Sequence, residues 1–183
     1  MKYYQKVLFA ILCGVCFCTI GLEAKSFAQS MAIDPSGAGV AVWNTKMNTF
    51  NSVQAAAISS SGVWSLPVTL SNPGVDTTFP LVVVDSSGNA IAMWSEFDSV
   101  MLVNTLQIAI LPFGGSWTSP LMISSPTEDV ASFSASDTPP YTLVMNNTGT
   151  IVAVWSAFVG ADLVIRSANF NNSLWSFPQT VSP

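Results

Sequence analysis

The amino-acid sequence predicts an all-β protein assembled from three copies of one four-stranded unit. Two blocks of sequence recur three times, and the insertions fall between the blocks. Each copy carries a turn signal of the type Asp-x-x-Gly or Asn-x-x-Gly, followed by a short apolar run that ends in tryptophan. Repetition with a period of about 50 residues is typical of propellers and other arrays of small β-sheets.

The first block contains the turn and the strand that follows it. Asp or Asn at the first turn position bonds backbone amides, and Gly at the fourth position accepts a positive φ. The strand lacks polar alternation, most clearly at 151–155, which predicts burial on both of its faces. The three sequences are DPSGAGVAVW (34–43), DSSGNAIAMW (85–94) and NNTGTIVAVW (146–155).

The second block contains two further strands joined by a tight turn. The three sequences align without gaps from Val53, Leu106 and Val164, each with tryptophan eleven residues later and proline three residues after that tryptophan. The proline falls near the start of the last strand, 66–70 in the first copy. An edge strand tolerates the amide that proline lacks, so this strand is expected at the edge of its sheet.

These blocks predict one domain at 29–183 with repeats at about 31–73, 78–126 and 140–183, each folded as a four-stranded antiparallel sheet. A strand that is apolar on both faces needs a neighbouring sheet on each side. We therefore expect the sheets to stack as the blades of a β-propeller-like array. Three blades are too few to close a ring, because propellers have about four to eight. The array is expected to be incomplete or to be completed by oligomerisation, as a homodimer or with another partner.

Residues 1–28 differ in kind from the rest and predict a helical secretory signal peptide. Lys2 and Lys6 make a positive start, an uncharged apolar stretch follows, and small residues precede a cleavage point after Ala28. Cleavage after Ala24 and an uncleaved anchor helix are the alternatives. The prediction is an exported protein of the periplasm, the cell surface or the extracellular space. It contacts a membrane only if the signal segment is retained.

Removal of this segment changes the composition of the chain. All three cysteines lie within it, so the mature chain has no disulfide and depends on its core alone. Lys46 and Arg166 are the basic residues outside it, against nine of the ten acidic residues. Nucleic acid is excluded as a partner, since phosphate contacts need clustered Lys and Arg.

The sequence lacks the groups that most enzymes use. It has no histidine, and no cysteine remains after cleavage, which excludes Ser-His-Asp triads, thiol catalysis and thiolate zinc sites. It has no phosphate-binding or dinucleotide-binding fingerprint. Asp34 and Asp85 begin turns, but the third copy has Asn146 there, and Asp-x-x-Gly supplies too few oxygens for calcium. The chain is therefore predicted not to be an enzyme and to hold no metal or cofactor.

Three acidic residues are the candidates for a binding site. Glu96 and Asp98 follow Trp94 in the expected loop between the second and third strands, and Asp162 lies in the matching loop of the third copy. These loops differ between the copies, and loops on a rigid scaffold are where ligands bind. Solvated acids that aid solubility are the alternative. Glu96 and Asp98 also offer the two carboxylates that a glycosidase needs.

The pattern resembles the propeller-type repeats of exported bacterial proteins, D-x-x-G-N-A-x-A-x-W followed by G-x-W-x-x-P. DSSGNAIAMW and GGSWTSP carry the likeness best, and it covers residues 31–183. The chain is also similar to the Asp-box repeats of sialidase-like propellers, although two residues, not one, separate Asp from Gly here. Sialidases hold a sugar carboxylate with several arginines, and this chain has Arg166 alone. The resemblance implies the propeller fold and not the sialidase activity.

These features predict an exported, non-catalytic binding or interaction module. Its ligand is a protein or a glycan that meets the loops between the blocks. The first alternative is a glycan-active enzyme related to sialidase-like propellers. The second is a structural subunit of a cell-envelope assembly.

Overall fold

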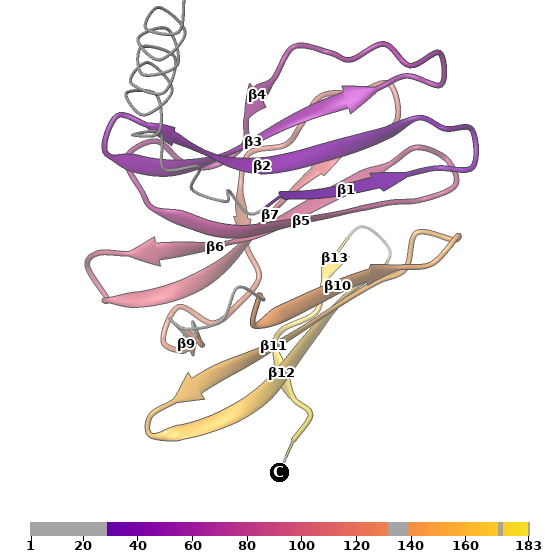
Figure 1. The fold of residues 1–183 in the computed structure, drawn as a ribbon. Coiled ribbons are helices and arrows are strands. Elements are labelled where there is room, and N and C mark those ends of the chain that lie inside the picture. Colours follow the sequence, from indigo (N-terminus) through magenta and orange to yellow (C-terminus); the bar gives the residue numbers. More distant parts are fainter. Residues whose placement is uncertain (1–28, 132–138, 172–173, 183) are drawn as a thin grey trace, which may run out of the picture.

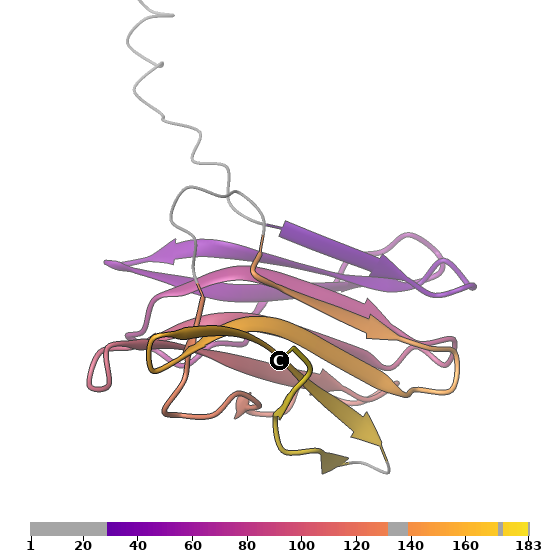
Figure 2. The same ribbon diagram turned by 90° about the horizontal axis from the view of Figure 1, so that it is seen from below.

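The computed structural model describes residues 29–131, 139–171 and 174–182, so the predicted signal segment lies outside the described residues. The described chain is all-β, and its strands form three antiparallel sheets that lie face against face in a stack (Figure 1). A view from below shows the same stack along another direction (Figure 2). The described residues form no helix able to cross a membrane. The predicted fold class, a propeller-like array of antiparallel blades, is confirmed.

Each blade contains four strands in chain order across its sheet. The first blade comprises β1 (Gln29–Ile33), β2 (Gly39–Met47), β3 (Phe50–Ile58) and β4 (Val68–Thr69). The second comprises β5 (Thr77–Val84), β6 (Ala90–Asp98), β7 (Val103–Leu111) and β8 (Leu121–Met122). The third comprises β10 (Tyr141–Met145), β11 (Ile151–Val159), β12 (Asp162–Asn171) and β14 (Gln179–Thr180), which pairs with β12 as β4 pairs with β3. Two further short strands join the third sheet, β9 (Asp129–Val130) on β11 and β13 (Leu174–Trp175) on β12.

Turns and hairpins gather at opposite ends of the stack (Figure 1). The turns of the first block join the first strand of each blade to the second at one end, the turn end. The β2–β3, β6–β7 and β11–β12 hairpins lie at the other end, the hairpin end. The first strands β1, β5 and β10 contact one another in order along one side of the stack. The short fourth strands therefore lie on the opposite side, the outer rim.

The second and third strands run further toward the hairpin end than the sequence predicts. The prediction that Glu96 and Asp98 lie in a loop after Trp94 is wrong, because both lie within β6. The ladder with β7 continues past the tryptophan, through the pairs Trp94–Gln107 and Asp98–Val103. This extension is largely polar, so the apolar run in the sequence ends before the strand does.

The fourth strand, β4, is two residues long, which is shorter than predicted. Hydroxyl groups continue the pairing on both sides of it. Ser65 Oγ accepts from the Ala57 N–H (3.0 Å), and Ser71 Oγ accepts from the Val53 N–H (3.1 Å). These side chains satisfy amides of the third strand at an edge where proline interrupts the ladder. In the other blades the same roles fall to Thr118, Ser124, Ser176 and Ser182.

The third blade is offset by one residue from the predicted alignment. Trp155 pairs with Arg166, whereas the first-block tryptophans of the other two blades pair with glutamine. The residue that corresponds to Val53 is therefore Ile165, not Val164. The ungapped alignment is wrong because the turn before the last tryptophan is one residue shorter in the third blade.

The long join before the third blade interrupts its first strand. In the second blade, β5 pairs with β6 along its length, apart from a bulge. In the third blade, β9 pairs with the end of β11 and β10 with its start, and residues 131–140 are inserted between them in the sequence. The buried Tyr141 hydroxyl donates to Phe79 O (2.7 Å) at the bulge and accepts from the Ser95 N–H (3.0 Å). Burial raises the pKa of the Tyr141 phenol.

Two apolar clusters hold the stack together. The first lies between the first and second blades and includes Val42 and the fully buried Trp94. The second lies between the second and third blades and includes Met93 and Trp155. Residues 90–96 of β6 are all buried, so the predicted burial on both faces holds for the second blade. In β2 and β11 buried and partly exposed residues alternate, because each of these blades has a neighbour on one face only.

The turns of the first block stack on one another at the turn end. Asp85 Oδ1 accepts from the Ser87 N–H (2.8 Å), which agrees with the predicted turn role. Gly149 of the next turn lies beside the Asp85 carboxylate, and its φ of +77° is a backbone conformation that favours glycine. In the first turn, the hydrogen bond from the Ser36 hydroxyl lowers the pKa of Asp34.

We expect Tyr141→Phe to lower the free energy of unfolding by about 1–3 kcal/mol. The change leaves the buried amide of Ser95 and the carbonyl of Phe79 without a partner. Equilibrium unfolding in urea measures the loss. Thr142→Val deletes a hydroxyl from the next, exposed position of β10 and should change stability by about 0.5 kcal/mol or less. Equal losses in the two variants would contradict the role of Tyr141 at the junction of the blades.

Candidate functional site

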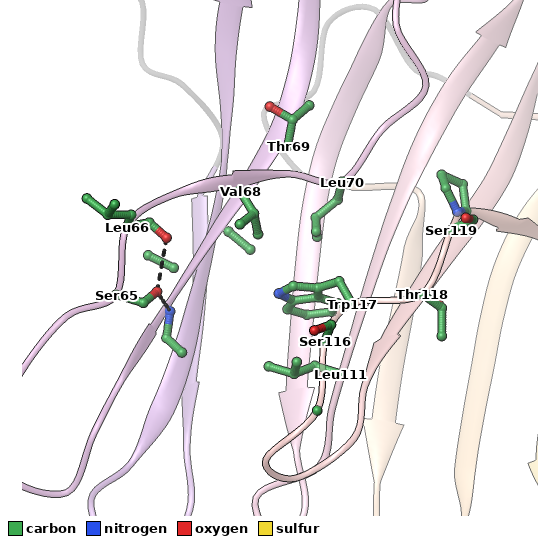
Figure 3. A pocket seen from close by; sticks show the side chains of 15 residues that line it. Ser65, Leu66, Val68, Thr69, Leu70, Leu111, Ser116, Trp117, Thr118 and Ser119 are labelled. Carbon is green, nitrogen blue, oxygen red and sulfur yellow. Dashed lines mark hydrogen bonds between the residues drawn. The ribbon is translucent and has the colours of Figure 1, made fainter.

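A groove on the outer rim, between the first and second blades, is the candidate binding site (Figure 3). Its volume is about 610 Å³. One wall comes from the first blade, around β4, and the other from the segment of the second blade that precedes β8. The groove therefore forms between the second blocks of two successive repeats. Its main apolar lining residues are Leu66, Val68, Leu70, Leu111 and Trp117.

Trp117 lies near the centre of this groove. Figure 3 shows its indole between Leu70 of the first blade and Leu111 of its own blade. One side of the ring packs against the cluster between the first two blades, and the residue remains partly exposed. The next residue holds the segment in place, because the Thr118 N–H donates to Ile110 O (2.9 Å). The indole is thus fixed, with part of its surface open to the groove.

The groove carries no charge. None of the fifteen described residues that line it is acidic or basic. The Ser65 hydroxyl is engaged with the backbone, since it donates to Leu66 O (3.1 Å). An aromatic face among hydroxyl groups, without charge, suits a neutral ligand that has both apolar and hydroxyl-bearing surfaces. The hydroxyl groups belong to Ser65, Thr69, Ser116, Thr118 and Ser119.

Glu96, a residue that the sequence singles out, lies away from solvent between the first two blades. Its exposed fraction is 8%. Its Oε1 accepts from Asn72 Nδ2 (3.3 Å), and within the described part of the chain its Oε2 has no hydrogen-bond partner. Another buried polar contact joins the same two blades, where Asn44 Nδ2 donates to Thr77 Oγ1 (2.9 Å). That Glu96 binds a ligand stays a prediction.

Asp98 and Asp162 lie at the hairpin end, on neighbouring blades. Asp98 closes its own hairpin: its Oδ1 accepts from the N–H groups of Met101 (3.0 Å) and Val100 (2.8 Å), which lower the pKa of Asp98. Asp162 begins β12 and is exposed. The three predicted residues therefore occupy a buried interface, a capped hairpin and an exposed strand end. Across the described ranges, no three acidic side chains gather in a way that could hold a metal ion.

A buried acid that the sequence does not single out ties the connection after the second blade to the third blade. Glu128 is 2% exposed, and its Oε2 lies 2.8 Å from Arg166 Nε. Its Oε1 accepts from Trp155 Nε1 (3.3 Å) and from the Ser125 N–H (3.1 Å). The arginine neutralises a carboxylate that would otherwise be costly to bury. In the ladders, Arg166 takes the position that glutamine holds in the other two blades, a correspondence that the ungapped sequence alignment hides.

Comparison with known proteins shows a likeness of fold to solved structures. No protein-family model and no curated protein matches the chain. Among solved structures, it is similar to the Hadza microbial sialidase Hz136, with a TM-score of 0.56 and 13% identity over 81% of this chain and 36% of that one. It is also similar to the polysaccharide lyase Uly1, with a TM-score of 0.55 and 8% identity over 84% of this chain and 40% of that one. The chain spans less than half the length of either structure, and at these identities the likeness concerns the fold alone.

The groove lies apart from the loops between the blocks, where the sequence predicts that a ligand binds. Every copy of the repeat has tryptophan at the position of Trp117, and this repetition predicts a packing role for the side chain. Trp117 does pack against the cluster between the first two blades. The opening on its other side arises where the rims of two stacked blades face each other. No single repeat contains both walls, and so no local pattern indicates the groove.

We expect Glu128→Gln to lower the free energy of unfolding by about 1.5–3 kcal/mol, because it removes the anionic partner of Arg166. Urea denaturation measures the change. Asp162→Asn removes the same charge from an exposed strand end and should have an effect of about 0.5 kcal/mol or less. If the two variants unfold at the same urea concentration, the ion pair does not stabilise the third blade.

Proposed function

We propose that the chain is an exported, non-catalytic module that binds a neutral glycan in the rim groove between its first two blades. The observation that carries this proposal is the composition of the groove, which is open and uncharged, with an indole near its centre and hydroxyl groups around it. Sugar rings present apolar C–H faces and hydroxyl-bearing edges. They therefore match a surface that combines stacking with hydrogen bonding.

The placement of the acidic side chains supports a neutral ligand. Asp76 Oδ1 accepts from the Asn51 N–H (2.8 Å), and Asp129 Oδ1 accepts from the Asn104 N–H (2.7 Å). Each of these aspartates holds the start of the third strand in the blade before it. Glu128 is paired with Arg166. The carboxylates of Asp76, Asp129 and Glu128 therefore stabilise the fold. This favours recognition through stacking and hydroxyl groups over recognition through ion pairs.

Glycan cleavage is the second candidate function. Two similar structures are a sialidase and a polysaccharide lyase, and Glu96 and Asp98 lie on the same face of β6. Against cleavage, Glu96 is buried and Asp98 is hydrogen-bonded to its own hairpin. The sequence also has no histidine. Binding without cleavage agrees better with this set of side chains.

We expect Trp117→Ala to weaken the binding of neutral oligosaccharides about tenfold or more, which corresponds to about 1.4 kcal/mol. The loss follows from removal of the stacking face in the groove. The probes are cellohexaose, maltohexaose and mannohexaose, titrated into the full chain by calorimetry. Failure of all three to bind the unaltered chain would contradict the neutral-glycan proposal.

Two further variants separate binding from folding. Leu66→Glu adds a charge to a groove wall at a position that is 86% exposed, so it should weaken binding without loss of core packing. Phe113→Ala removes an exposed ring of the same blade outside the groove and should leave the affinity unchanged. Equal affinities for Trp117→Ala and Phe113→Ala would overturn the site. Release of sugar from a probe, abolished by Glu96→Gln, would favour the enzyme instead.

Export is tested separately. β1 begins at Gln29, directly after the proposed cleavage point, so removal of residues 1–28 leaves the first blade whole. We expect the protein recovered from the periplasm or medium of an expressing bacterium to begin at Gln29 on N-terminal sequencing. A protein that stays in the cytoplasm with Met1 in place would contradict export, and a start at Lys25 would move the cleavage to Ala24.

A further inference from the structure

We propose that two copies of this chain join head to tail and close a ring of six blades. The outer face of the first blade of each copy would pack on the outer face of the third blade of the other copy, at two identical joints. This inference goes beyond the glycan-binding function, because the rim groove lies within one chain and needs no second copy.

The template for such a joint occurs twice inside the chain. Trp94 and Trp117 of the second blade belong to the cluster that this blade shares with the first. Trp155 and Trp175 of the third blade belong to the cluster that it shares with the second. Each of these blades thus packs two tryptophans onto the blade before it, and the two interfaces use equivalent positions.

The first blade carries the same two tryptophans, and no described residue plays the part of the blade before it. Trp43 lies on the face of β2 opposite to Val42, and therefore away from the first cluster. Trp64 is 47% exposed. Met31 and Ile33 of β1 share the face of Trp43, and Ile33 is 61% exposed. One half of a blade-to-blade interface is therefore uncovered.

The third blade carries the other half. Val154 and Ile165 correspond in the ladders to Val42 and Val53, which lie in one cluster with Trp94. Val42 and Val53 are fully buried, whereas their counterparts in the third blade are partly exposed. Inside the chain, the side chains at these positions pack against a tryptophan of the next blade. On the outer face of the third blade the equivalent side chains have no such tryptophan among the described residues.

A hollow lies at this place on the third blade. It has a volume of about 410 Å³, and Val154, Ile165 and Pro140 are among its lining residues. Val144, which is 57% exposed, lies on the same face. Among the described strand positions on this face and on the outer face of the first blade, the charged residue is Asp129, which pairs with Phe158 and accepts from the Asn104 N–H (2.7 Å). The hollow itself is lined by uncharged residues, so contact there buries no unpaired charge.

The need to close the ring favours a second copy of the chain as the partner that covers the outer faces of the first and third blades. A head-to-tail contact between two copies leaves one further pair of matching faces, which either meet or continue into a filament. Six blades fall within the range of about four to eight that closed propellers have. A closed pair covers both apolar faces of each copy, whereas a single joint leaves one of each kind exposed to solvent.

The mass of the full chain in solution tests the proposal, measured by analytical ultracentrifugation over a range of concentrations. We expect twice the mass of one chain. Ile33→Lys and Val144→Glu each add a charge at an exposed position, and each should raise the dissociation constant about 100-fold or more. Val100→Lys, at the exposed tip of the β6–β7 hairpin, is the control and should remain dimeric. Circular dichroism verifies that every variant is folded.

A mixing experiment distinguishes the head-to-tail pair from other dimers. A heterodimer of the Ile33→Lys and Val144→Glu variants has one unaltered joint and one joint with opposite charges, so a mixture should recover the mass of a dimer. In a dimer formed through two first blades, Val144→Glu would stay dimeric and mixing would restore nothing. Absence of recovery, a monomeric unaltered chain, or a mass that rises without limit with concentration would overturn the proposal.

Discussion

The stacking of apolar sheets, each covered by the next, is the constraint on which the rest of this structure depends. A small sheet that is apolar on both sides is unstable alone in water and gains stability as its faces are covered. The second blade meets this requirement in full, with residues 90–96 of β6 buried without interruption. Two tryptophans at each interface add large buried surfaces to the aliphatic side chains around them. No cysteine lies beyond residue 28, so this packing acts without disulfides.

Polar side chains close the edges that stacking leaves open. Serine and threonine hydroxyls accept from third-strand amides on either side of each fourth strand, and aspartates after the first two blades hold the start of the third strand. The fourth strands can therefore be very short without leaving buried amides unpaired. The short strands leave space at the outer rim, where the groove around Trp117 forms. The edge chemistry of the repeat thus creates the candidate site.

The scarcity of charge shapes what this chain can recognise. One arginine lies in the described chain, and it is paired with the buried Glu128. The groove lining holds no charge at all. The glycan recognition that we propose for this surface would depend on shape, stacking and hydroxyl groups, which is a different basis from the arginine-rich sites that hold sugar carboxylates. The likeness to a sialidase structure is accordingly a likeness of fold.

Local patterns were sufficient to predict the repeats, the turns and the all-β class, because each is encoded within about ten residues of chain. The strand ends were not predictable, because ladder hydrogen bonds run on through polar residues such as Glu96 after the apolar run has ended. The offset in the third blade came from a single missing turn residue, which only the pairing of Trp155 with Arg166 exposes.

The sequence by itself determined that three sheets of one kind must stack. Only the tertiary structure decided how deeply equivalent residues of the three copies are buried. Trp94 is fully buried and Trp43 is not, although both hold the same position in the second strand of their blades. The rim groove likewise belongs to two repeats at once. The physical reason is the same in both cases: burial depends on which surface lies opposite a side chain, and that surface comes from another copy of the repeat.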